Sequence, residues 1–316
     1  MNPTARHGAP GALALSVVVP VHNEVESLGE LVARVGAVLD ALGRRGELIL
    51  VDDGSSDGTG VVLRRLAARE PRLRIFATRR RRGQTMALKA GLARARGEIV
   101  VTLDGDLQNA PEDIPVLLQA LDAGADLVTG WRRERHDGWF TRRLPSMAAN
   151  AWIRRLTGVP IHDHGCALKA YRRWLVDALH LYGDHHRLVT GYAALQGARI
   201  AEVPVRHAPR RSGRSKYGLS RLLRVTADAL AMHLLLRHRR RPSRWFFRQA
   251  APFFVLAGLT TILAGASADG PESVVVWIGA TFILAFAAVS LAAYGLFAEL
   301  LVRLAPAAPR ASKALR

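Results

Sequence analysis

Two carboxylates separated by one residue follow a short apolar segment and have the spacing to hold a divalent cation. Asp104 and Asp106 flank Gly105 directly after the apolar residues 99–103. Mg²⁺ and Mn²⁺ prefer carboxylate oxygens, and such a cation can bridge two adjacent phosphates and neutralise a departing diphosphate. Most triplets of this kind are surface loops, so the position after a strand-like segment is what favours a metal site here.

A second acidic segment has the composition of a nucleotide-binding loop. Asp52 and Asp53 follow the apolar residues 48–51, and Asp57 comes soon after them. An aspartate in this place can accept hydrogen bonds from a nucleobase edge or a ribose hydroxyl. The alternative is a turn followed by a helix with an Asp N-cap, which accounts for Asp57 better than for Asp52.

The elements that must position these residues alternate between strands and helices, which predicts an α/β fold with a mostly parallel sheet. The predicted strands are Leu15–Pro20, Glu47–Val51, Arg72–Ala77, Ile99–Leu103 and Asp126–Thr129. The predicted helices are Ser27–Leu42, Gly58–Arg69, Gly83–Ala95 and Pro111–Ala123, the last with Asn109 as its N-cap candidate. Ligands of such sheets bind beyond the carboxyl ends of the strands, so we expect the acidic residues to gather at one rim.

Composition limits the partners of the protein. The chain has 45 Lys and Arg against 26 Asp and Glu, a net charge of +19, which indicates anionic partners such as phosphorylated substrates or an anionic membrane. Its one cysteine, Cys166, excludes an internal disulfide and fits a reducing compartment. The apolar residues 12–21 are short and are followed by Glu24 and Glu26, so we interpret them as a first strand rather than a signal peptide.

Two uncharged segments near the C-terminus, residues 249–268 and 273–298, each have the roughly 20 residues that cross a bilayer. The alternative is a pair of buried core helices. Basic residues flank the pair and acidic residues occupy the turn 269–272, which predicts a transmembrane hairpin with both termini cytoplasmic. Residues 219–236 are interpreted as an amphipathic helix in the membrane interface, or alternatively as a surface helix.

The predicted organisation therefore has five parts. They are a disordered tail (1–11), a catalytic domain (12–218), an amphipathic helix with a basic linker (219–243), two transmembrane helices (244–303) and a cytoplasmic tail (304–316).

Three segments in the right order, Val18–Glu24, Val51–Thr59 and Leu103–Gln108, resemble the family 2 glycosyltransferases. These enzymes have the GT-A nucleotide-diphospho-sugar transferase fold. Asp163–Arg173 and Ser212–Gly218 are similar to the polyprenyl-phosphate branch, which includes dolichol-phosphate mannosyltransferase and undecaprenyl-phosphate 4-deoxy-4-formamido-L-arabinose transferase. The resemblance covers roughly residues 14–300.

The resemblance implies a metal-dependent, inverting transfer of a sugar from a nucleotide-diphosphate donor to a polyprenyl (undecaprenyl) phosphate. It implies catalytic roles for Asp106 and Asp163 and metal ligation, to Mg²⁺ or Mn²⁺, by Asp104, Asp106 and Gln108. The implied nucleotide-sugar-binding residues are Pro20, Asn23, Glu24, Asp52, Asp53, Gln84 and Asp104. The implied acceptor-phosphate residues are Lys169, Arg210, Ser215 and Lys216.

The resemblance also implies a location in the inner (cytoplasmic) membrane, contact with membrane lipid and a possible homo-oligomer. No nucleic acid is expected, because no zinc-knuckle spacing or aromatic RNA-binding motif occurs. A lipid phosphate is already largely anionic at neutral pH, so its approach to a diphosphate needs cations more than a base. Arg210, Arg211, Arg214 and Lys216 fit that need, or alternatively attract anionic lipid. Asp163 either orients the acceptor or acts as a base.

The remaining chemistry-bearing residues have simpler interpretations. Arg79–Arg82 replaces the Arg-Asn common in relatives and is interpreted as a solvated loop, and Cys166 as a packing residue. Two other functions stay open. A processive polysaccharide synthase of the same fold normally carries a Gln-x-x-Arg-Trp motif, and here Arg244-Trp245 lacks that glutamine. A non-enzymatic basic membrane scaffold is the other alternative; more broadly, another membrane-bound family 2 enzyme with a lipid or polysaccharide acceptor is possible.

Overall fold

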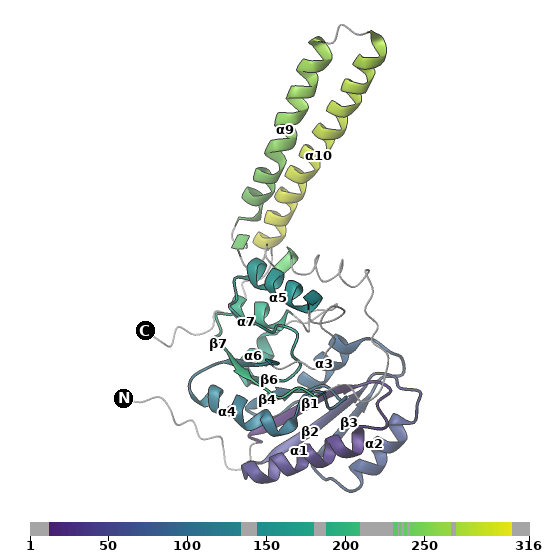
Figure 1. Cartoon of the computed structure of the whole chain (residues 1–316), viewed down its shortest axis with the longest axis vertical. Helices are drawn as coiled ribbons and strands as arrows, with labels where there is room; N and C mark the ends of the chain where they lie inside the picture. The colour runs from purple at the N-terminus through teal and green to yellow at the C-terminus, as the bar shows by residue number, and fades with distance from the viewer. Residues whose placement is uncertain are drawn as a thin grey trace, which may run out of the picture. The chain divides into compact units, whose positions relative to one another are not determined.

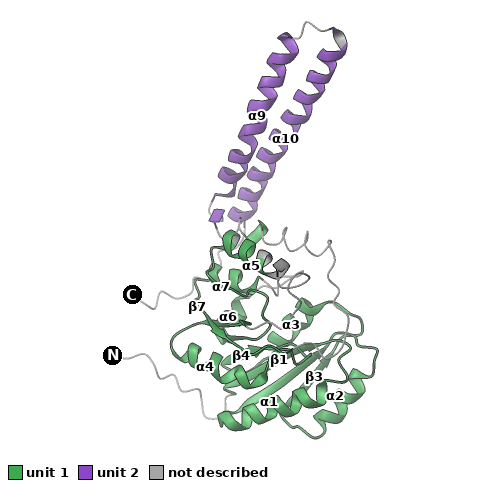
Figure 2. Cartoon of the chain, viewed as in Figure 1, with its two compact units in different colours: residues 1–232 green, residues 233–316 purple. Residues whose placement is uncertain are grey.

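The computed structural model describes residues 13–133, 144–179, 188–208, 230–232, 234, 237–238, 241–266 and 270–304. The chain divides into two compact units, residues 1–232 and 233–316, coloured separately in Figure 2. The first unit is an α/β domain and the second is a pair of long helices. The predicted segments 1–11, 304–316 and most of 219–236 lie outside the described residues, apart from Leu304.

A seven-stranded sheet forms the centre of the first unit, in the order β3-β2-β1-β4-β6-β5-β7. Its strands are β1 (Leu15–Val21), β2 (Gly46–Asp52), β3 (Leu73–Ala77), β4 (Ile99–Thr102), β5 (Leu127–Trp131), β6 (Lys169–Arg172) and β7 (Ile200–Pro204). Only β6 among these strands is antiparallel to its neighbours, β4 and β5. The prediction of a mostly parallel α/β sheet is confirmed.

Helices cover both faces of this sheet (Figure 1). One face packs against α1 (Leu28–Leu42), α2 (Thr59–Ala67) and α4 (Ile114–Asp122), the last preceded by the 3₁₀ turn η1 (Pro111–Asp113). The other face packs against α3 (Gln84–Leu92), α6 (Arg173–Ala178) and α7 (Val189–Leu195). In β1, Val17 and Val19 enter the first core and Val18 the second. Burial on both faces explains why the central strands are continuously apolar in sequence.

Each predicted strand and helix within the described residues is present, with ends shifted by a few residues, and several elements were not predicted. The unpredicted elements are β6, β7, α5 (Leu144–Thr157), α6 and α7. The prediction of Asn109 as an N-cap is wrong. Asn109 is buried and its backbone bridges His207, while Ala110 precedes the turn without a side-chain cap. Pro111 does begin that turn, as predicted.

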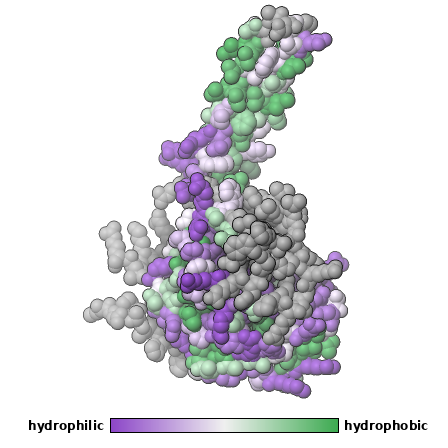
Figure 3. Space-filling view, viewed as in Figure 1, coloured by the Kyte–Doolittle hydropathy of each residue, from purple (hydrophilic) through white to green (hydrophobic). Residues whose placement is uncertain are grey.

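The second unit consists of α9 (Pro242–Ala266) and α10 (Pro271–Leu304). Both helices are long and apolar enough to cross a bilayer, and most of their large apolar side chains are exposed, as the green surface in Figure 3 shows. They pack on each other through small residues such as Ala257 and Ala288, with a 2.8 Å contact between the hydroxyl oxygens of Thr260 and Thr281. Close packing through small residues and hydroxyl contacts is typical of helix pairs in lipid.

A stability prediction follows from the packing at Gly97, just before β4. A Cβ atom placed there would lie 2.6 Å from both the carbonyl carbon of Leu15 and the amide nitrogen of Ser16, and backbone cannot move aside cheaply. Gly97→Ala should therefore destabilise the domain by about 2 kcal/mol, which lowers the apparent melting temperature in detergent by roughly 5 °C.

The matched control is Gly29→Ala, because Gly29 lies in α1 with no atom within 4 Å of its added Cβ. Alanine favours helices over glycine, so this variant should melt at or above the wild-type temperature. Equal melting temperatures for the two variants would contradict the packing at Gly97.

Candidate active site

The parallel pairing of β1 with β2 and β4 brings their carboxyl ends, and the acidic loops that follow, to one edge of the sheet. Asp52 and Asp53 are buried, while Asp104 and Asp106 are partly exposed. Backbone hydrogen bonds fix the loops to each other, because the Asp53 amide donates to Val21 O at 2.9 Å. The rim predicted from the sequence is therefore present.

The loop after β1 interlocks with the loop after β2. The amide of Asn23 donates to the Ser55 hydroxyl and its side-chain oxygen accepts from the Ser56 amide, both at 2.9 Å. Asn23 has a left-handed backbone (φ 58°), a conformation that Asn tolerates better than most residues. Asp52 Oδ1 accepts from the Ser55 amide at 2.9 Å. Asn23, predicted to line a nucleoside pocket, thus also holds the shape of this rim.

Asp57 has a structural role beside α2, but it is not the N-cap that the alternative interpretation predicted. The N-cap is Gly58, without a side-chain cap. Asp57 Oδ1 accepts from the Thr59 amide at 3.0 Å, and its Oδ2 accepts from the Val25 amide at 3.3 Å. Burial acts to raise the pKa of Asp57, but hydrogen bonds from Thr59 and Val25 hold it below the usual range.

The predicted metal loop follows β4. Asp104 Oδ1 accepts from the Gln84 side-chain amide at 2.8 Å, and Asp106 Oδ1 accepts from the Gln108 amide at 3.2 Å. A Cβ atom on Gly105 would lie 1.9 Å from Glu24 Oε2, so glycine lets that carboxylate lie directly against the loop. Placing Glu24 beside the metal loop agrees with a position at the donor site.

The donor set of this loop suits a hard divalent cation. In the described part of the chain, no group of three or more His, Cys, Asp or Glu is placed to hold a metal ion, so protein carboxylates would fill only some of the coordination positions. Mg²⁺ is commonly held by one or two carboxylates, with substrate phosphates and water as the remaining ligands. Asp104 and Asp106 fit that arrangement. The next residue, Leu107, is buried with φ 59°, a strained conformation of the kind that clusters at functional sites.

Asp53 organises the loop that contains the arginine run. Its two carboxylate oxygens accept from the amides of Arg82 and Gly83, each at 2.7 Å. Because both oxygens already bind backbone amides, Asp53 supports the site through this loop. The next residue, Gln84, donates a hydrogen bond from its side chain to Asp104, so this loop is connected to the predicted metal loop.

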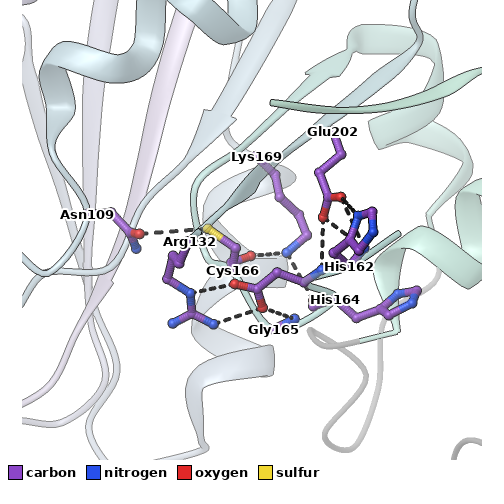
Figure 4. A network of polar contacts seen from close by, with 9 residues as sticks. Asn109, Arg132, His162, His164, Gly165, Cys166, Lys169 and Glu202 are labelled. Atoms are coloured by element: carbon purple, nitrogen blue, oxygen red, sulfur yellow. Dashed lines mark hydrogen bonds and ion pairs between the residues drawn. The ribbon is translucent and has the colours of Figure 1, made fainter. Parts of the chain in front are cut away.

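Asp163 has polar contacts with Arg132, Glu202 and Gly165, three residues that are labelled in Figure 4. Arg132, just after β5, donates Nε to Asp163 Oδ2 at 2.7 Å and Nη2 to Oδ1 at 3.0 Å. Burial opposes the charge of Arg132, but the hydrogen bonds and charge of Asp163 raise its pKa above the usual value. Arg132 was missed in the sequence, although it follows a predicted strand end just as the acidic residues do.

Glu202 on β7 fixes the backbone at His162 and Asp163. Its carboxylate accepts from the amides of His162 and Asp163 at 3.0 and 2.8 Å. The His162 ring stacks on Trp131, with ring centroids 4.5 Å apart. Glu202 was also missed, because sequence carries no signal for a contact across 39 residues.

Lys169 is placed differently from its expected role toward the acceptor phosphate. Its ammonium is buried and donates to the carbonyl oxygens of His164 and Cys166 (Figure 4). Burial lowers its pKa. In this structure Lys169 therefore secures the loop 163–168 and does not face the rim. Cys166 is fully buried, and burial raises its pKa to about 11, which confirms its interpretation as a packing residue.

The segment predicted to hold the acceptor begins beside the metal loop. The amide of Ala208 donates to Gln108 O at 2.9 Å, and Arg206 pairs with the buried Asp113 at 2.7 Å. Arg210, Ser215 and Lys216 lie outside the described residues.

Comparison with known proteins identifies the family of the chain. The model of glycosyl transferase family 2 matches residues 16–179. Dodecaprenyl-phosphate galacturonate synthase of Rhizobium johnstonii is 44% identical over 258 residues, which cover 80% of this chain and 76% of that protein. Undecaprenyl-phosphate 4-deoxy-4-formamido-L-arabinose transferase of Edwardsiella ictaluri is 43% identical over 216 residues, 68% of this chain and 66% of that protein.

A similar fold occurs in glucosyl-3-phosphoglycerate synthase from Mycobacterium tuberculosis, solved with Mn²⁺, UDP and glucosyl-3-phosphoglycerate. The TM-score is 0.53 at 23% identity, over 71% of this chain and 79% of that one. At this identity the likeness establishes the fold alone, which is the expected GT-A fold.

A pH prediction follows from His164, which is fully buried with its Nδ1 2.8 Å from the Thr190 hydroxyl. Burial, followed by the charge of Lys169, lowers its pKa from 6.5 to about 4. The unfolded chain then binds a proton that the folded chain does not, so the stability due to neutral His164 is present above pH 6.5 and is lost as the pH falls toward 4. Between pH 7.5 and 5 the loss should be about 2 kcal/mol.

The measurement compares apparent melting temperatures of wild type and His164→Asn at both pH values. Asparagine keeps a polar partner for Thr190 and cannot titrate, so the variant should lose less stability on acidification. An identical pH dependence in the two proteins would show that His164 is not the titrating group.

Proposed function

Because the chain belongs to glycosyl transferase family 2, we propose that it transfers a sugar from a nucleotide-diphosphate donor to a polyprenyl phosphate at a membrane surface. Its relatives are named for dodecaprenyl-phosphate and undecaprenyl-phosphate products or acceptors. The helices α9 and α10 support membrane association, which a lipid acceptor requires. We further propose that the polyprenyl phosphate is undecaprenyl phosphate.

One observation carries the proposal. The start of the basic segment that contains Arg210 and Lys216 is hydrogen-bonded to the metal loop itself, through Ala208 and Gln108. Donor diphosphate and acceptor phosphate are both anionic, so a transferase needs cations where the two meet. This junction supports an acceptor site next to a donor site.

The donor would lie along the rim. Asp104 and Asp106, with Gln108, would hold a Mg²⁺ or Mn²⁺ ion that neutralises the charge of the departing diphosphate. Asp52 has one oxygen bound to the Ser55 amide and would use the other on the nucleobase. Pro20, Asn23 and Glu24 would line the nucleoside pocket. Asp53 would hold the adjoining loop through the Arg82 amide, and Gln84 would hold Asp104.

The acceptor would attack without a strong base. A phosphate monoester has its second pKa near 6, so at neutral pH an anionic oxygen is available. That oxygen forms a bond to the anomeric carbon as the bond to the diphosphate breaks, which inverts the configuration. Both oxygens of Asp163 contact Arg132, so we assign Asp163 to holding that guanidinium at the site. Arg210, Ser215 and Lys216 would receive the acceptor phosphate.

Location follows from the same proposal. Basic residues on both sides of the hairpin and the acidic turn 269–272 favour cytoplasmic termini in an inner membrane. Nucleotide sugars would then reach the rim from the cytoplasm. A homo-oligomer formed through the apolar helices is also proposed, since their large side chains are exposed.

The principal test is Asp106→Asn in the full chain. Asparagine can still accept the hydrogen bond from Gln108 but has no charge for a divalent cation, so transfer should fall at least about 100-fold. Transfer is measured as labelled sugar extracted with undecaprenyl phosphate, with Mg²⁺ or Mn²⁺ present, across a panel of nucleotide sugars. Chelator should abolish the wild-type activity and added metal should restore it.

The matched control is Asp122→Asn, an exposed carboxylate that only pairs with Arg44 at 3.4 Å on the surface. Such a pair contributes little to stability, so this variant should retain activity. Near-normal transfer by Asp106→Asn, or turnover unaffected by chelator, would remove the metal role. Sugar incorporated into polysaccharide or another lipid, with none on undecaprenyl phosphate, would favour a different acceptor.

A further inference from the structure

The arginine run 79–82 presents four charged side chains that the described structure does not use. All four residues are exposed. Other arginines of this domain, such as Arg34, Arg72 and Arg74, pair with carboxylates at 2.6–3.0 Å. Among the described residues, no hydrogen bond or ion pair involves the guanidinium groups of 79–82. The interpretation as a solvated loop therefore describes their exposure and leaves their purpose open.

The backbone of this run is nevertheless fixed. Asp53 binds the amides of Arg82 and Gly83, and the Thr78 hydroxyl donates to Arg80 O at 2.9 Å. Gly54 lets the run approach closely, since a Cβ there would lie 2.7 Å from the Arg81 amide nitrogen. The arginines thus extend from a rigid base, which lowers the entropy lost when they bind a partner.

This base belongs to the rim of the candidate active site. Gly83 is followed by Gln84, whose side chain donates to Asp104 at 2.8 Å. If the acceptor is a lipid phosphate, as proposed above, the rim that carries Asp104 must approach the head-group layer for every turnover. The run 79–82 would approach the same layer with it.

We propose that Arg79–Arg82 is a docking surface for anionic lipid head groups, which holds the rim of the active site against the membrane. A guanidinium group is well suited to phosphate because it offers several donors in one plane. Sites for a small ligand are concave and bury most of it, whereas these four side chains are all exposed, which suits a layer of head groups. The helices α9 and α10 keep such a layer permanently within reach.

The test uses the full chain in nanodiscs of neutral lipid alone and of neutral lipid with 30% phosphatidylglycerol, each with a trace of undecaprenyl phosphate. Wild-type transfer at subsaturating acceptor should be about tenfold faster in the anionic nanodiscs, a gain that high salt removes. Arg80→Gln with Arg81→Gln should lose most of this gain. The matched control is Arg65→Gln with Arg69→Gln, two exposed arginines on and just after α2, and should keep it.

A second readout does not depend on turnover. Cys166 is the only cysteine and is fully buried, so a spin label on Arg80→Cys would be selective. A lipid-bound relaxation agent should quench this label more strongly in anionic than in neutral nanodiscs, and should quench a label on Arg65→Cys equally in both. Equal quenching at both positions in both lipids would overturn the docking surface.

The outcomes separate this inference from the function it rests on. If the Arg80 and Arg81 variant loses activity equally in neutral lipid, with a raised KM for the donor, the run binds the nucleotide sugar and the docking proposal is wrong. If wild type transfers to undecaprenyl phosphate equally well in both lipids, docking is wrong and the proposed function stands. If no nanodisc supports transfer to that acceptor, the proposed function fails, and the label alone decides on docking.

Discussion

Like charges at one edge of a sheet repel each other, and several contacts of the candidate active site counter that repulsion. Parallel strands place Asp52, Asp53 and Asp104 together because each follows a strand that ends at the same edge. Asp53 is satisfied by two backbone amides and Asp163 by the guanidinium of Arg132. Asp104 accepts a hydrogen bond from the neutral side-chain amide of Gln84. In the proposed function, Asp104 holds the metal, whereas Asp53 and Asp163 support the structure around it.

The same contacts join parts of the chain that are distant in sequence. Asp53 binds the backbone of the loop before α3, and the first residue of α3, Gln84, contacts Asp104. The carbonyl oxygen of Gln108 accepts a hydrogen bond from the amide of Ala208, which follows β7. Glu202 and Lys169 both bind backbone groups of the loop of Asp163. The loops after β1, β2 and β4 and the chain just after β7 are therefore joined by hydrogen bonds. In the proposed function, this connection would keep the two anionic substrates next to each other.

Sequence predicted the parts of this site that lie directly after apolar strands, because an uninterrupted apolar run ending in Asp is a local signal. Asp52 and Asp104 were found in this way. The strand β6 has only four residues and carries charge at both ends, so no apolar run marks it. The family resemblance indicated that Lys169 belongs to the site but did not indicate how exposed its side chain is. In the structure Lys169 is buried. Asparagine is a residue type that often caps helices, but the backbone of Asn109 instead pairs with that of His207.

The most direct measurement is a cryo-EM structure of the full chain in a lipid nanodisc with Mn²⁺, the nucleoside diphosphate of its donor and undecaprenyl phosphate. The account predicts the metal within about 2.2 Å of oxygens of Asp104 and Asp106, bridging the diphosphate. It also predicts the lipid phosphate beside that diphosphate, in contact with Arg210 or Lys216. A diphosphate bound away from Asp104 and Asp106, or a lipid phosphate remote from it, would contradict the account.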